Sequence, residues 1–313
     1  AARVGLGISE AAAAPAAQSM IADLFSRGQR TAALSVLAVA GPIGTMAAFI
    51  AGGALNQVVG WRMTMVTLGV PGVMLAALLL LTVREPRRGA SEHQRTDATA
   101  YDLAETIRYL WNLRSLRWLT AGASLNLFAA YATVVWSAPF LIRVHGMTTE
   151  QAGTWLGITT GVGGMAGTVL GGLVIQRLAR SDTRWMLRGP ALSSALAAPF
   201  IVLFLTLPSP AAPAANLGAA LFGSCMIGPV MAVTQTLAKV AMRARAAALV
   251  GLTFNLVGAG LGPLTVGMLS DSLRVHAGDG GVRYALLLSV TTALVAAAVS
   301  FARGARHIRH ELL

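Results

Sequence analysis

Residues 31–61 (TAALSVLAVAGPIGTMAAFIAGGALNQVVGW) and 63–83 (MTMVTLGVPGVMLAALLLLTV) contain no Asp, Glu, Lys or Arg, and only Arg62 separates them. The hydrocarbon core of a bilayer is ~30 Å thick, so a helix of ~20 apolar residues crosses it once. Each stretch is long enough to do so. These residues therefore predict an all-α membrane protein, with two neighbouring spans in this part of the chain.

The same pattern continues through the rest of the chain. Residues 189–238 are fifty uncharged positions, too many for one span, and the proline-rich centre at 208–213 (PSPAAP) predicts that they form two helices. Residues 4–22 carry Glu10 as their one charged side chain and add a further span. Four more uncharged stretches can each cross once, at 118–142, 151–176, 246–270 and 284–302. Nine membrane-spanning helices are expected.

The charged residues indicate the orientation. Of 313 residues, 55% are hydrophobic and 12% are charged, and the formal net charge is +12. Nineteen of the 24 Lys and Arg residues fall in alternate connections, which the positive-inside rule assigns to the cytoplasm. The carboxyl terminus is then cytoplasmic and the amino terminus periplasmic or extracellular. Basic loops that face anionic lipid explain the charge without nucleic acid, and the composition favours a bacterial inner membrane.

The residues that usually carry enzyme chemistry are few. Cys225 is the single cysteine, and the five histidines are expected in loops or the tail, so the sequence offers no metal-ligand spacing. No motif resembles a hydrolytic site. We expect neither an enzyme nor a cofactor or metal.

An internal repeat indicates the architecture. Residues 30–34 read RTAAL and Gly52 follows 22 residues after Arg30; residues 245–249 read RAAAL and Gly267 follows 22 residues after Arg245. The offset spans six predicted helices. Two halves of six helices resemble the major facilitator fold.

Three regions follow from that resemblance. Residues 1–83 are expected to be the remaining three helices of an N-terminal bundle, and residues 118–313 a C-terminal six-helix bundle with a short tail. The nine helices would then be the fourth to twelfth of twelve, with the first three missing. Residues 84–117 are predicted to be a cytoplasmic linker that ends in a short amphipathic helix, capped by Asp102 and Glu105.

Several short motifs resemble the spinster family of lipid transporters, among them residues 3–10 (RVGLGISE), 15–19 (PAAQS), 60–62 (GWR), 81–86 (LTVREP) and 267–271 (GMLSD). The resemblance implies export of an amphipathic anionic lipid, such as a lysolipid or a sphingoid phosphate, with proton coupling. Its implied partners are membrane lipids, this small solute and protons, and the implied state is a monomer. The family's first-helix acidic residue has no counterpart in this sequence.

Arg3 and Glu10 are the ionisable pair associated with the first predicted span. Their seven-residue spacing places both on one helix face, and charges at that depth are costly unless they serve a function. The functional interpretation is that Glu10 takes up and releases a proton, while Arg3 holds an anionic head group. The alternative is a fixed ion pair that joins helices.

Two further groups of polar residues are candidates. A cytoplasmic gate is predicted from charges at helix ends, namely Asp23, Arg27, Arg30, Arg177 and Arg180; the alternative is a set of solvated ion pairs. The cavity-lining candidates are polar or aromatic residues within spans, namely Gln18, Asn126, Tyr131, Trp136, Thr234, Gln235 and Asn255; the alternative is interhelical packing.

The predicted function is secondary active transport by alternating access. Two alternatives stay open, a drug or organic-anion exporter of the same superfamily and an inactive, truncated membrane protein. The glycines between residues 157 and 172 are interpreted as close-packing surfaces of a helix, because no Lys-Ser or Lys-Thr follows to complete a phosphate loop.

Overall fold

The computed structural model describes residues 17, 20, 27–82, 102–209, 211–239 and 242–311. The regular structure of these residues is entirely helical, as the sequence predicted. The helices are α2 (Arg27–Thr82), α3 (Leu103–Asn112), α4 (Arg114–His145), α5 (Thr149–Ala179), α6 (Trp185–Thr206), α7 (Ala211–Ser224), α8 (Ile227–Leu237), α9 (Arg243–Asn255), α10 (Gly262–Ala277) and α11 (Gly281–Glu311). A π-helix, Leu256–Leu261, joins α9 to α10.

Seven helical segments of the described residues are long and apolar enough to cross a membrane. One of them combines α7 with α8, and another combines α9, the π-helix and α10. The predicted division of residues 189–238 is confirmed, since α6 ends at Thr206 and α7 begins at Ala211. The predicted span at 4–22 lies outside the described residues, and the two spans predicted on either side of Arg62 fall within the single segment Ala40–Thr82, so the count of nine is not confirmed.

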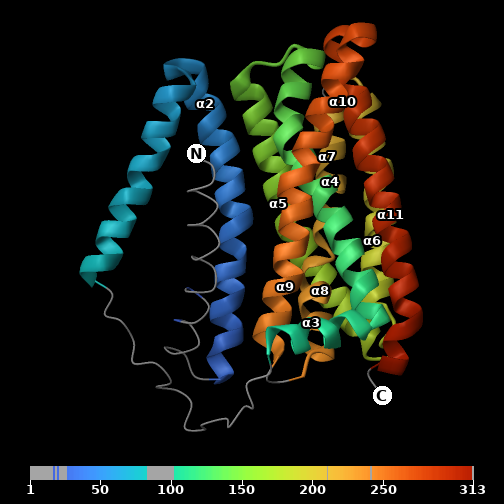
Figure 1. Cartoon of the computed structure of the whole chain (residues 1–313). Coiled ribbons are helices and arrows are strands. Elements are labelled where there is room, and N and C mark those ends of the chain that lie inside the picture. Colours follow the sequence, from blue (N-terminus) through green and yellow to red (C-terminus); the bar gives the residue numbers. More distant parts are fainter. Residues whose placement is uncertain are drawn as a thin grey trace.

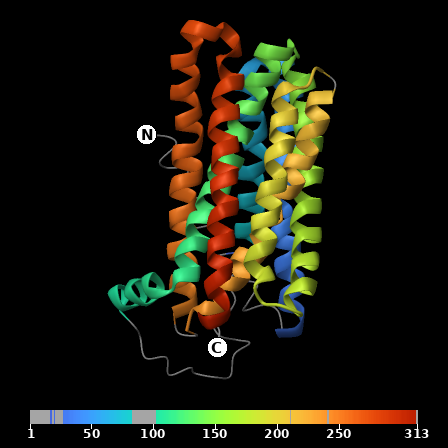
Figure 2. The same cartoon turned by 90° about the vertical axis from the view of Figure 1, so that its right-hand side faces the viewer.

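The long helices run side by side, and α3 lies across one end of them, the end that also carries the carboxyl terminus (Figures 1 and 2). The connection from α5 to α6, which contains Arg180 and Arg184, lies at the same end. We call this the basic end. The turns after α4 and α10, at Gly146 and Gly278, lie at the opposite end.

Helix α2 consists of two arms that meet at Gly60 (Figure 1). Gly60 has φ 73° and ψ 166°, a backbone conformation that is essentially restricted to glycine. The hydroxyl of Thr64 donates to the Gly60 carbonyl at 2.9 Å, and the Arg62 guanidinium lies 4.3 Å from the Trp61 ring centroid. The arms correspond to the two uncharged stretches on either side of Arg62.

The described core lies among α4 to α11, in two apolar clusters. One cluster contains Phe140 and Phe204, whose rings pack edge to face with centroids 5.3 Å apart. The other, nearer the basic end, contains Phe301 of α11, packed against Gly122 of α4. The first arm of α2 packs against α5 instead.

Helix α5 packs through two glycine faces. Gly153, Gly157 and Gly161 lie against α2, at Phe49, Ile50 and Met46. Gly163 and Gly167 lie against α7, at Leu217 and Leu221, and Gly171 lies against Cys225, the residue that follows α7. A Cβ atom at any of these six glycines would meet a neighbour at well under the usual contact distance. The interpretation of the glycine-rich segment as a close-packing surface is confirmed for Gly157, Gly161, Gly163, Gly167 and Gly171, whereas a Cβ atom at Gly172 would meet nothing within 4 Å.

The short helix α3 has the expected cap. The Asp102 side chain accepts from the Leu103 backbone N–H at 2.7 Å, and Glu105 accepts from the Asp102 backbone N–H at 3.3 Å. Leu110 is buried against the bundle, whereas Trp111 is 67% exposed. That α3 belongs to a cytoplasmic linker stays a prediction.

The start of α4 is capped from a distant part of the chain. Leu113, at the N-cap position, provides no side-chain hydrogen bond. The Glu311 carboxylate at the end of α11 instead accepts from the backbone N–H of Arg114 at 2.7 Å and of Ser115 at 3.1 Å. The Ser115 hydroxyl also donates to Glu311.

Candidate functional site

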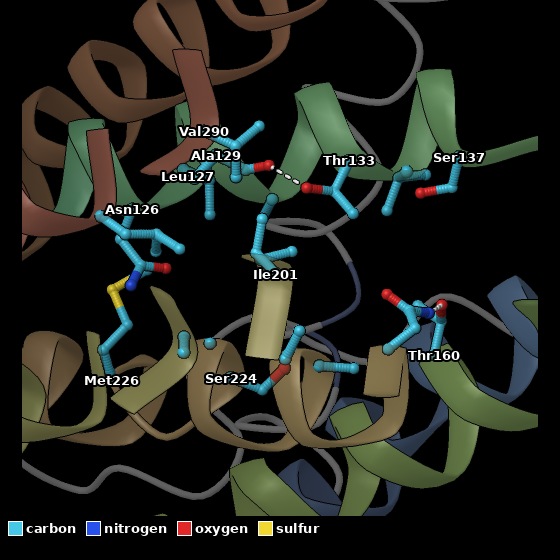
Figure 3. Close-up of a pocket in the computed structure, with 18 of the residues that line it drawn as sticks. Asn126, Leu127, Ala129, Thr133, Ser137, Thr160, Ile201, Ser224, Met226 and Val290 are labelled. Carbon is cyan, nitrogen blue, oxygen red and sulfur yellow. Dashed lines mark hydrogen bonds between the residues drawn. The ribbon is translucent and has the colours of Figure 1, made fainter. Parts of the chain in front are cut away.

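A cavity of about 160 Å³ lies inside the group of helices from α4 to α11 (Figure 3). Helices α4, α5, α6, α7, α8 and α11 line it, and Phe49 of α2 reaches its wall. We call it the bundle cavity. Its position between helices of one bundle is typical of small-molecule sites in helical proteins.

Two buried amides fix the polar part of the bundle cavity. Asn126 of α4 is 1% exposed and its Nδ2 donates to Ser194 Oγ of α6 at 2.8 Å. Asn216 of α7 is 3% exposed, and its Nδ2 donates to the hydroxyls of Thr159 and Thr160 of α5, at 3.0 and 3.1 Å. Each amide therefore joins two helices that line the cavity.

A hydroxyl in the cavity wall has no partner within the described protein. Ser137 of α4 is 1% exposed, and its Oγ makes no hydrogen bond. Thr133, one turn earlier, donates to the Ala129 carbonyl at 2.8 Å, and Figure 3 shows both side chains beside the cavity. A buried, unpaired hydroxyl is costly, so a ligand oxygen beside Ser137 would recover a hydrogen bond.

The chemistry of the bundle cavity is neutral. Among the residues that the structure describes, its lining consists of apolar side chains together with amides and hydroxyls, without a charged group. Such a wall suits the uncharged part of a ligand, with a few groups that fix its orientation.

A second cavity, of about 700 Å³, lies where α2 meets the helices of the bundle. Its lining includes Pro42 of α2, Gln176 of α5 and Pro229 of α8. It follows the part of α5 nearest the basic end. Further along α5, towards the opposite end, the glycine face from Gly153 to Gly161 closes against α2. The α2–α5 boundary is thus in close contact over Gly153 to Gly161 and hollow towards the basic end, and a further cavity of about 520 Å³ lies at the opposite end, where α2 meets the end of α4 and the start of α5.

Four of the predicted site residues, Arg3, Glu10, Gln18 and Asp23, lie outside the described residues. Arg27 and Arg30 fall in the first turns of α2, where only the backbone is described. Arg177 and Arg180 are exposed at the basic end of α5. The coupling pair and the gate therefore stay predictions.

The remaining candidates, those for the cavity lining, do not all lie at the bundle cavity. Asn126 lines the bundle cavity, as proposed. Trp136 donates from Nε1 to the Pro263 carbonyl at 2.9 Å, a contact between α4 and α10, and buried Thr234 donates to the Val230 carbonyl at 2.8 Å. Tyr131 is 37% exposed, Gln235 is exposed on α8, and Asn255 donates to the Gly251 carbonyl at 3.0 Å. Of these candidates, only Asn126 lines the bundle cavity.

Four polar residues that were not predicted also line the bundle cavity, namely Ser137, Thr160, Asn216 and Ser224. Asn216 carried a usable signal, because it is the single amide side chain between residues 189 and 234 and a buried amide in a span needs a partner. The serines and threonines carried no such signal in the sequence, because their hydroxyls can donate to carbonyls of their own helix.

Comparison with known proteins supplies the context for this geometry. The sequence profile of the Major Facilitator Superfamily matches residues 1–263. An "MFS-type efflux pump" of Mycolicibacterium smegmatis is 32% identical over 99% of this chain and 72% of its own length. A zebrafish (Danio rerio) "Sphingosine-1-phosphate transporter SPNS2" is 26% identical over 86% of this chain and 56% of its own.

A similar fold is found among solved structures. The crystal structure of a bacterial homologue of the human lysosomal transporter Spinster, described as inward-facing and unoccupied, superposes with a TM-score of 0.76. It is 24% identical, and the match covers 99% of this chain and 76% of that one. The likeness to spinster-type proteins that the short motifs indicated is confirmed.

Proposed function

Because this chain belongs to the Major Facilitator Superfamily, a family of membrane transporters rather than enzymes, we propose that it is a secondary active transporter that works by alternating access. Its cargo would be an amphipathic, anionic, lipid-like solute such as a lysolipid. Protons would move together with this cargo or in exchange for it. The chain is a multi-pass integral membrane protein. Its bacterial relatives fit the bacterial inner membrane expected from the composition.

The α2–α5 boundary supports alternating access. Helices α2 and α5 touch through Gly153, Gly157 and Gly161 and separate around a cavity of about 700 Å³ towards the basic end, as expected for a carrier in which one group of helices moves against another. Under the positive-inside rule the basic end faces the cytoplasm, and the cavity there, about 700 Å³ against about 520 Å³ at the opposite end, favours an inward-open state.

The observation that carries the proposed cargo is the neutral lining of the bundle cavity. At about 160 Å³ the cavity would hold only a part of such a solute: a segment of acyl chain would contact its apolar walls, and a hydroxyl such as that of Ser137 would bond a neutral oxygen of the cargo. A charged head group would need a cation, for which Arg3 is the candidate. The zebrafish relative's name, which specifies a phosphorylated sphingoid base, supports the same class of cargo.

Proton coupling rests on the sequence. Glu10 is the only carboxylate in the nine predicted spans, so it is the group available there to bind and release a proton. Replacing it by Gln keeps the size and the hydrogen-bonding capacity but removes the titration.

The test is uptake into vesicles driven by a pH gradient, with a fluorescent lysolipid as cargo. We expect Glu10→Gln to abolish gradient-driven uptake while cargo binding persists, and Arg3→Ala to weaken binding of the anionic cargo. Glu150→Gln, the same change at an exposed carboxylate of α5, is the matched control and should transport normally. Retained gradient-driven uptake by Glu10→Gln would refute the coupling.

A second candidate is export of a drug-like or organic-anion cargo, favoured by the name of the mycobacterial relative, which aligns with 99% of this chain. The same vesicles separate the two, because a drug exporter would move a hydrophobic dye in preference to the lysolipid. In a competition assay, lysolipid that fails to inhibit dye transport would favour this second candidate.

A further inference from the structure

A cavity of about 660 Å³ lies at the basic end, between the short helix α3 and the neighbouring parts of α4 and α9. Figures 1 and 2 show α3 lying crosswise at this end, beside those two helices. We call this cavity the α3 groove. It shares no lining residue with the bundle cavity, and its volume lies in the ~300–1,000 Å³ range of ligand sites.

The wall from α4 is a continuous stripe. Arg117, Thr120, Ala121, Ser124 and Leu125 follow one another at helical spacing, so they share one face. From Arg117 to Leu125 the helix rises by ~12 Å, at 1.5 Å per residue. This length is close to that of one leaflet, half of the ~30 Å hydrocarbon core.

The other walls are apolar as well. Helix α9 contributes Leu249, Val250 and Thr253, and α3 contributes Ile107 and Trp111. Ile107 is 45% exposed and Trp111 is 67% exposed, so α3 presents apolar surface beside the groove. Aromatic rings at a bilayer interface favour the level of the head groups.

The mouth of the α3 groove is cationic. Arg117 is exposed, and its guanidinium lies 6.0 Å from the Trp111 ring centroid. Among the described residues no carboxylate forms a salt bridge with Arg117. Arg245 is also exposed and lies one turn before Leu249 on α9. The groove therefore combines an apolar interior with positive charge at the basic end.

The inner part of the groove contains an unpaired donor. The hydroxyls of Thr120 and Thr253 each donate to the carbonyl four residues earlier, at 2.9 and 2.8 Å. Ser124 is 5% exposed, and its Oγ has no hydrogen-bond partner in the part of the chain that the structure describes. Because the Ser124 side chain is small, it does not fill the inner part of the groove.

We propose that the α3 groove binds an anionic phospholipid of the cytoplasmic leaflet, with one acyl chain between α4 and α9 and the phosphate at Arg117. A guanidinium binds phosphate through two parallel hydrogen bonds, and anionic lipids are concentrated in this leaflet. The bound lipid would hold α3 against the bundle. This site is separate from the proposed transport cavity and does not depend on the cargo.

The experiment is native mass spectrometry of the purified, delipidated full chain, with dioleoyl phosphatidylglycerol or dioleoyl phosphatidylcholine added. We expect the wild type to retain one phosphatidylglycerol in preference to phosphatidylcholine. Arg117→Ala should bind phosphatidylglycerol about fivefold more weakly, the effect of one arginine at an anionic surface. Arg306→Ala removes an exposed arginine of α11 at the same end and should bind as the wild type does.

A second variant tests the acyl-chain site. Ser124→Leu fills the inner groove without changing charge, and it should reduce retention of both lipids. Equal retention of phosphatidylglycerol by Arg117→Ala and Arg306→Ala, or undiminished retention by Ser124→Leu, would overturn the proposal. Should either variant fail to fold, a phosphatidylglycerol with a photoreactive acyl chain can be cross-linked to the wild type. Labelling of Leu125 or Val250 is expected, and labelling confined to other helices would contradict the site.

Discussion

Gly153 on α5 faces Gly53 on α2 so closely that a Cβ atom on Gly153 would lie 2.9 Å from the Gly53 Cα. The same Cβ would also meet the Phe49 carbonyl oxygen. Backbone atoms cannot yield as a flexible side chain can, so this contact exists only while both residues are glycine. The close contact between α2 and α5 depends on it.

Gly153→Ala should therefore separate α2 from α5 and widen the end of the molecule opposite the basic end. Overpacking costs ~1–3 kcal/mol, which would raise the open population about tenfold. A cysteine at Gln57, in a Cys225→Ala background, reports this as faster labelling by a membrane-impermeant maleimide. Gly172→Ala is the control, because a Cβ there meets nothing within 4 Å. Equal labelling in both variants would show that the glycine contact does not close this end.

The two buried amides should differ in their contribution to stability. Asn216→Ala leaves the Thr159 hydroxyl bonded to the Trp155 carbonyl at 2.7 Å, so we expect a loss of ~0.6–1.7 kcal/mol. Asn126→Ala removes the amide that donates to the fully buried Ser194 hydroxyl, and leaving a buried polar group unsatisfied costs ~1–3 kcal/mol. Unfolding in mixed detergent should rank Asn126→Ala as the less stable variant, and the reverse order would contradict this account.

Ser137→Ala should leave the free energy of unfolding of the cargo-free protein unchanged or slightly raised. The substitution removes a buried hydroxyl without a partner, and burying such a group costs ~1–3 kcal/mol. If a cargo oxygen bonds this hydroxyl, the same variant should lose part of the stabilisation that lysolipid confers. Thermal melting with and without lysolipid measures both effects. Full stabilisation of Ser137→Ala by the cargo would remove Ser137 from the site.

Glu311→Ala should destabilise the start of α4, because two backbone N–H groups and the Ser115 hydroxyl lose their acceptor. Loss of an N-terminal cap costs ~0.5–2 kcal/mol. Hydrogen exchange at Arg114 and Ser115 should accelerate, whereas His310→Ala, a change at the exposed neighbouring position, should leave it unaltered. Unchanged exchange in Glu311→Ala would mean that the cap adds no stability.

Reporter fusions test the orientation. Fusions at Gly89 and at His310 should both report the cytoplasm, because the nineteen basic residues of the alternate connections face that side. A periplasmic signal at either position would reverse the assignment of the basic end and, with it, the inward-open interpretation.

The membrane spans could be predicted because charge and proline interrupt them. Arg62 marks the junction of the α2 arms, and the prolines at 208–213 mark the break between α6 and α7. The α3 cap was predictable for a similar reason, since Asp102 and Glu105 act locally. Each of these features depends on residues close together in the chain.

The cavity was harder to predict because its residues come from six or more helices. A span that is apolar on all sides gives little sign of which face points inward, so Tyr131 and Trp136 were as plausible as Ser137. Trp136 bonds the Pro263 carbonyl on α10, whereas Ser137, the next residue, lines the bundle cavity. Only the packing of α4 against its neighbours separates these two roles.

The turn at Gly60 has a consequence for how the protein is made. Its backbone conformation costs ~1–3 kcal/mol for a residue other than glycine, and it joins the α2 arms without an intervening loop. During synthesis the two arms would therefore enter the bilayer together as a helical hairpin, with Arg62 the one charged residue near the tip that must be translocated. A substitution at Gly60 should then act on membrane insertion and yield, and leave the activity of the correctly inserted molecules intact.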